Sequence, residues 1–188
     1  MRLLVALGGL ALASCATAQA QDAAEARGHD WDRVSMEAKS WGRMVSGWSI
    51  GKSGTGGWWV RENSDGSLTP YGAYSVTYHS FDAGPEGFAR VREALADIPN
   101  PAPEASDGCE NFMTDAVYGT VRVTQQATTI ETAWNEGCMD DDYVAFMSKL
   151  RAANELVESW GKAGTVLRTE SFDETGAATG ITYPENAG

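Results

Sequence analysis

Alternation of apolar and polar residues, the period expected of a strand with one buried face, recurs along the chain from residue 48 onward. Residues 48–53 and 57–62 are short apolar segments separated by a Gly-rich turn, and Tyr74, Val76 and Tyr78 alternate with polar neighbours. Turn-forming residues follow the second segment. The pattern therefore predicts antiparallel strands in the first half of the chain.

A second pattern places apolar residues at steps of three and four, which is the spacing of one face of a helix. It predicts a short amphipathic helix over 31–45, with Asp30 as its N-cap. It also predicts a helix that opens at Gly84-Pro85 and ends before the Pro-rich run 99–103. That proline run is the strongest candidate for an internal boundary.

The second half repeats the order of strands followed by a helix. Residues 117–123 and 128–134 alternate and predict a hairpin, and a long helix capped by Asp140 or Asp141 extends through Trp160. Residues 166–172 and 178–183 flank a turn and predict a terminal hairpin.

These elements predict an α+β fold class, with an antiparallel sheet and two main helices packed on one face. The repeated order of elements also raises the hypothesis that a strands-then-helix unit was duplicated internally, although the two halves do not align residue by residue. We expect a single α+β domain over 31–188, with the Pro-rich boundary at 99–103 inside it.

The first residues form an export signal. Met1-Arg2 precedes an almost unbroken apolar run over 3–13, which has the length of a signal-peptide core and is too short to remain as a membrane span. Leu12-Ala13-Ser14-Cys15 is similar to the lipobox of bacterial lipoproteins. The resemblance covers the leader alone.

The lipoprotein resemblance implies that residues 1–14 are removed and that Cys15 receives a lipid anchor. Because Ala16 and not aspartate follows the cysteine, it also implies an outer membrane lipoprotein that faces the periplasm. Ala18-Gln19-Ala20 offers the alternative of ordinary cleavage after residue 20, which gives a soluble periplasmic or secreted protein. Residues 15–30 are small and polar and predict a flexible tether.

Once Cys15 is lipidated or removed, Cys109 and Cys138 remain as an even pair in a compartment that permits disulfides. We predict that they form a structural disulfide. The chain has only two histidines, which is a poor supply of ligands for zinc, so we expect neither a metal site nor a cofactor.

Charge excludes one class of partner. The 188 residues include 26 acidic and 14 basic side chains, for a formal net charge of −12, and such a surface does not fit nucleic acid or an anionic lipid headgroup. Contact with a membrane is therefore expected only through a lipid on Cys15 that inserts into the bilayer.

One motif resembles catalytic machinery by its letters. Gly47-Trp48-Ser49-Ile50-Gly51 matches the nucleophile elbow of α/β-hydrolases, but no helix follows Ser49, and His79 is the only histidine downstream. A secreted hydrolase that uses Ser49 or a carboxylate pair therefore remains an alternative, and no catalytic residue is predicted. Candidate carboxylates lie at Asp107, Glu110 and Asp115 and in the run 140–142.

Seven tryptophans are the other unusual feature. In a strand, Trp58 and Trp59 must point to opposite faces, so one of them is expected at a surface, where it could form a binding patch with nearby tyrosines. The sequence thus predicts a non-catalytic binding or structural module of the cell envelope. Its ligand would be an envelope protein, a peptide or a glycan, and an inhibitor of a periplasmic enzyme is a further alternative.

Overall fold

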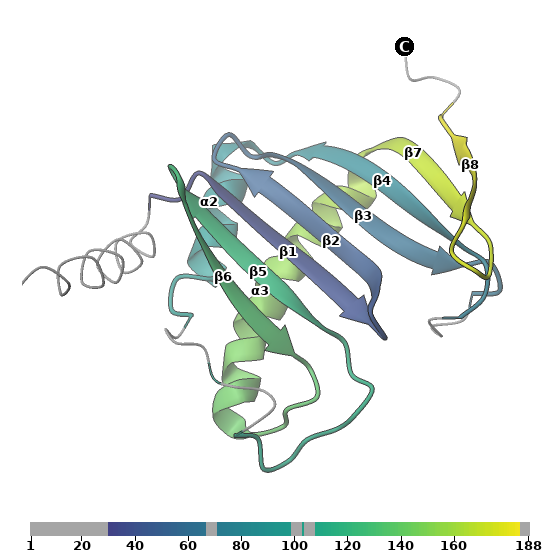
Figure 1. The fold of residues 1–188 in the computed structure, drawn as a ribbon. Helices are drawn as coiled ribbons and strands as arrows, with labels where there is room; N and C mark the ends of the chain where they lie inside the picture. The colour runs from purple at the N-terminus through teal and green to yellow at the C-terminus, as the bar shows by residue number, and fades with distance from the viewer. Residues whose placement is uncertain (1–29, 67–70, 99–102, 104–107, 185–188) are drawn as a thin grey trace, which may run out of the picture.

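An antiparallel sheet of eight strands organises the computed structural model, which describes residues 30–66, 71–98, 103 and 108–184 (Figure 1). Its strand order is β6-β5-β1-β2-β3-β4-β7-β8, so β1 lies inside the sheet and the last two hairpins lie at opposite edges. The strands are β1 (Arg33–Ser40), β2 (Arg43–Gly51), β3 (Thr55–Asn63), β4 (Tyr74–Asp82), β5 (Tyr118–Gln125), β6 (Thr128–Asn135), β7 (Thr165–Phe172) and β8 (Ala178–Thr182).

Two helices cover the same face of this sheet, and the view in Figure 1 shows both of them behind the strands. Helix α2 (Gly84–Ala94) begins with Pro85 in its first turn, where a missing N–H costs nothing. Helix α3 (Asp141–Ala163) is the long connection that carries the chain from β6 at one edge to β7 on the other side of β4.

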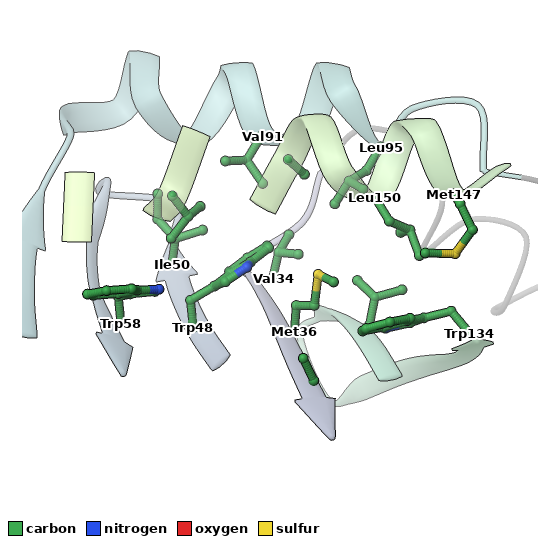
Figure 2. Close-up of a cluster of buried hydrophobic side chains, with 14 of the residues drawn as sticks. Val34, Met36, Trp48, Ile50, Trp58, Val91, Leu95, Trp134, Met147 and Leu150 are labelled. Carbon is green, nitrogen blue, oxygen red and sulfur yellow. The ribbon is translucent and has the colours of Figure 1, made fainter. Parts of the chain in front are cut away.

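The core lies between the helices and the sheet (Figure 2). Alternate residues of the strands point toward the helices, and in α3 the buried residues recur every three or four positions. The core side chains labelled in Figure 2 come from both layers. The sheet provides Val34, Met36, Trp48, Ile50, Trp58 and Trp134. The helical layer provides Val91 from α2, Leu95 directly after α2, and Met147 and Leu150 from α3.

Close packing requires a glycine where α3 meets the sheet. A Cβ atom on Gly161 would lie 2.5 Å from the Cβ atom of Trp58, well inside van der Waals contact. Gly161 therefore lets the last turns of α3 rest directly on the Trp58 indole.

The predicted α+β class is wrong. Of the residues that the structure describes, 46% are in strands and 24% in helices, and the strands form one eight-stranded sheet, so the fold is mainly β. The internal duplication is not observed either, since four strands precede α2 whereas α3 lies between two pairs of strands. Strands of the second half are added at both edges of the first four, and do not form a second unit.

The main source of that error is the predicted helix over 31–45. These residues form β1, a turn and the start of β2. Val34, Met36 and Ala38 are buried in alternation, which is a strand period, and the step of four from Val34 to Ala38 fits both periods. Because β1 pairs with β2 on one side and with β5 on the other, the strand is favoured over the helix.

The other predicted elements are confirmed with shifted ends. The strands expected from residue 48 onward appear as β2 to β8, and the two later helices appear as α2 and α3. Most of the Pro-rich run lies outside the described residues, as do the leader, Cys15 and nearly all of the expected tether. Among the described residues, no helix combines the length and hydropathy needed to cross a bilayer.

Strand pairing gathers three distant segments at one end of the sheet. Lys39 near the end of β1 pairs with Tyr118 at the start of β5, and Tyr118 also pairs with Asn135 at the end of β6. The β1–β2 turn, the segment that enters β5 and the segment that leaves β6 are therefore neighbours.

Candidate binding site at one end of the sheet

The β1–β2 turn presents a tryptophan to solvent in a costly backbone conformation. Trp41 and Gly42 have φ angles of 51° and 75°, both positive, as a two-residue type I′ turn requires. Glycine adopts this region freely, but a bulky L-residue pays about 1–2 kcal/mol there. Trp41 is also 57% exposed. Retention of a strained and exposed indole at a turn marks it as a candidate functional residue.

Tyr118 holds this turn in place from the neighbouring strand. The backbone N–H of Gly42 donates a hydrogen bond of 2.8 Å to the Tyr118 hydroxyl. Because Tyr118 is itself paired within the sheet, the position of Trp41 is fixed relative to β5.

A disulfide holds the opposing loop. Cys109 and Cys138 are bonded, with their Cα atoms 5.8 Å apart, and this confirms the predicted disulfide. Backbone hydrogen bonds extend the cross-link: Met113 N–H donates to the Gly137 carbonyl at 2.8 Å, and Met139 N–H donates to the Asn111 carbonyl at 2.9 Å. The loop that enters β5 is thus tied to the segment that leaves β6.

Asp140 adds a second clamp. Its carboxylate accepts hydrogen bonds from the Glu110 N–H at 2.8 Å and from the backbone and side-chain amides of Asn111 at 3.1 Å each. The bond from the Glu110 amide is the largest of the effects that lower the pKa of Asp140. Asp140 does occupy the N-cap position of α3, but its side chain makes no capping hydrogen bond, since it is committed to the loop.

Between the turn and the loop lies an open pocket of about 270 Å³. It is lined by Trp41, Phe112, Met113, Thr114, Asp115, Ala116, Tyr118 and Asn135. Asp115 has a φ of 69°, a region that aspartate tolerates better than most residues. Three aromatic side chains, a thioether and one carboxylate therefore surround a space on a cross-linked scaffold. Another cavity, of about 30 Å³ between Trp31, Leu95 and the β5–β6 hairpin, is too small for anything larger than water.

Trp58 and Trp59 lie on opposite faces of β3, as the alternation of a strand predicts, and one of the two is partly exposed. Trp58 is 5% exposed and packs in the core, where its ring lies 4.9 Å from that of His79. Trp59 is half-buried on the opposite face, where its indole covers Gly47 and its N–H donates to the Met44 sulfur at 2.6 Å. Of this pair, only Trp59 is accessible to a ligand, and its ring N–H is already bonded to the Met44 sulfur.

Ser49 and His79 lie on opposite faces of the sheet. Ser49 pairs with Gly57, which pairs with Ser80, so Ser49 shares the helix-free face with Ser80. His79 is adjacent to Ser80 in β4 and therefore points to the opposite, helix-covered face, where burial lowers its pKa. The two side chains cannot meet, and the glycines around Ser49 belong to a strand and not to a nucleophile elbow.

The structure gives the described candidate carboxylates separate positions, with Asp141 and Asp142 in the first turn of α3. Asp140 serves the loop, Glu110 donates its amide to it, and Asp115 lines the pocket. Asp107 lies outside the described residues. The sulfur atoms of Cys109 and Cys138 lie within 4.8 Å of an Asp140 oxygen, but their bond to each other leaves no thiolate to bind a metal.

Comparison of the chain with family models, with curated proteins and with solved structures gives no match.

Sequence reasoning assigned Trp41 to the apolar face of a helix and singled out neither Phe112 nor Met113. One local signal was present, since Gly42 directly after an aromatic residue is suited to a tight turn. Two large apolar residues in a loop between Cys109 and the predicted strand were a second signal.

Proposed function

We propose that this protein is an exported, non-catalytic binding module of the bacterial cell envelope, and that it is held at the outer membrane by a lipid on Cys15. The observation that carries the binding role is the pocket between Trp41 and the disulfide-held loop. Trp41, Phe112 and Met113 are exposed although they are large and apolar. The turn and the loop that carry them are pre-positioned by the Tyr118 hydroxyl, the disulfide and the Asp140 clamp. Pre-organised exposed apolar surface is typical of binding sites.

The apolar leader, the cysteine that follows it and a structural disulfide support export, because disulfides persist in oxidising compartments. Intact mass of the protein from membrane and soluble envelope fractions tests the anchor. We expect a mature chain that begins at Cys15 with added acyl mass. A chain that begins at Gln21 without lipid would contradict the anchor and would indicate a soluble periplasmic form.

Two methionines allow the binding role to be tested without knowledge of the ligand. Met113 lines the pocket and Met139 does not, yet each is 56% exposed. Peroxide oxidises exposed methionine to the sulfoxide, which mass spectrometry detects at each site. We expect Met113 to be oxidised more slowly than Met139 in intact envelopes, and at a similar rate in the purified protein.

Trp41→Ala removes one wall of the pocket and supplies the control. In this variant the difference between envelopes and purified protein should disappear. Equal protection of Met113 and Met139 in wild-type envelopes would show that the pocket is unoccupied in its native setting and would overturn the proposed binding site.

A further inference from the structure

The pocket walls combine aromatic side chains with a carboxylate. Trp41 comes from the β1–β2 turn, Phe112 from the disulfide-held loop and Tyr118 from the start of β5, so three rings from separate segments border the same space. The face of an aromatic ring carries negative electrostatic potential and attracts cations. Asp115, on the same wall, adds a full negative charge.

The two chain segments on the loop side of the pocket carry charges of one sign. Segments 108–118 and 135–142 contain six acidic residues and no lysine or arginine. Three of the six have other partners, since Glu136 pairs with Arg151 at 3.4 Å, Asp140 binds the loop amides, and Asp142 accepts a hydrogen bond of 2.8 Å from the Tyr143 N–H. Asp115 is the carboxylate among the pocket-lining residues.

The basic residues nearest in sequence to the turn do not reverse this balance. Lys39 and Arg43 flank Trp41, but neither lines the pocket. The Lys39 ammonium lies 3.9 Å from the Glu37 carboxylate, which Arg122 also approaches at 3.4 Å. Because Asp115 is the charged side chain among those that line the pocket, an anionic ligand would be repelled there, whereas a cation would be attracted.

We propose that the pocket binds an organic cation, an ammonium or trimethylammonium group that sits among Trp41, Phe112 and Tyr118 and pairs with Asp115. The inference rests on the proposed binding function and specifies its ligand chemistry. At about 270 Å³ the space is just below the ~300 Å³ lower end of small-molecule pockets, which suits one cationic headgroup or one side chain. Met113 provides a polarisable apolar surface for the carbon chain that bears the charge.

Two sources could supply such a cation, a small molecule or a lysine side chain of a protein, and the probes separate them. Choline represents the first source, and Nα-acetyl-lysine N-methylamide represents the second. Each has a neutral counterpart of nearly the same shape, 3,3-dimethylbutan-1-ol and Nα-acetyl-norleucine N-methylamide. Titration calorimetry with the full chain measures the affinity of each probe.

We expect at least one cation to bind about tenfold or more tightly than its neutral counterpart, as cation–π attraction with a carboxylate partner implies. That cation should also slow the oxidation of Met113 relative to Met139. Asp115→Asn should weaken the cation and leave the neutral probe unchanged, and asparagine tolerates the positive φ of this position. Asp141→Asn, an equal change of charge outside the pocket lining, should have little effect on either probe.

Equal affinity for charged and neutral probes would overturn the cation inference, as would an Asp115→Asn variant that binds as the wild type does. If Met113 is protected in intact envelopes but neither cation binds, the proposed binding function stands and the ligand is of another class. If Met113 is unprotected in envelopes, the binding function itself fails, and with it the inference that rests on it.

Discussion

Removal of the Cys109–Cys138 disulfide should cost about 3.6 kcal/mol of unfolding free energy. The two cysteines are 29 positions apart, and closing a loop of that length removes about 12 cal/mol/K of entropy from the unfolded chain in the chain-entropy model, or about 3.6 kcal/mol at 25 °C. The loop contains the whole β5–β6 hairpin, so the cross-link restrains one edge of the sheet.

The suitable variant replaces both cysteines with alanine. Cys138 is almost fully buried, so a serine there would add a polar group to the core, and a single substitution would leave a reactive thiol. Guanidinium chloride unfolding, followed by tryptophan fluorescence at pH 7, gives the free energy for the variant and for the oxidised wild type. We expect the midpoint to fall by about 1 M, given the usual slope for a domain of this size.

A loss below about 1 kcal/mol would refute this reasoning, because it would mean that the unfolded chain is already restrained without the bond. Stable domains commonly have an unfolding free energy of about 5–15 kcal/mol. Even a wild type at the lower end of that range would keep about 1.4 kcal/mol after the loss, so the variant should remain folded. In the folded variant, Met113 should be oxidised faster than in the wild type, since the loop that carries it loses its covalent support.

Three further predictions follow from single side chains. Burial lowers the pKa of His79 below its ordinary 6.5, so as the pH falls the unfolded chain binds a proton at this residue before the folded chain does. The free energy of unfolding from guanidinium titrations should therefore fall from pH 7 to pH 5, and His79→Phe should abolish that fall. Asp140→Ala should speed amide hydrogen exchange at Glu110, because the Glu110 N–H loses its acceptor. Unchanged exchange would show that Asp140 does not hold the loop. Gly161→Ala should lower thermal stability by about 1–3 kcal/mol through overpacking on the Trp58 ring, while Gly180→Ala, with open space around it, should change little.

The sequence predicted most elements because their signals are local. Alternation, Pro85 at a helix start and the Asp-rich start of α3 each depend on a few neighbouring residues. The region over 31–45 failed because its apolar spacing satisfied two periods, and only pairing with distant β5 made the strand the better choice. Since β1 and the first residues of β2 were assigned to a helix, the share of strand in the fold was underestimated as well.

Strand order and the pocket could not be read from the sequence for a related reason. The pairings β1–β5 and β4–β7 join segments that are far apart along the chain, and no local pattern selects them. Of the two, the β1–β5 pairing is the one that brings the turn with Trp41 beside Tyr118, and the β5–β6 pairing then adds Asn135. The disulfide was predictable because it follows from the parity of cysteines in an oxidising compartment, an argument that needs no geometry.

The central place of β1 has a mechanical consequence. A tether that joins the chain ahead of Asp30 would transmit any pull from the membrane to β1, which is hydrogen-bonded along its length to both β2 and β5. Force along that strand loads two ladders in shear at once, whereas the terminal strand β8, paired only with β7, would open one bond at a time. For the anchor proposed above, the N-terminal end is therefore a stronger attachment point than the end at β8.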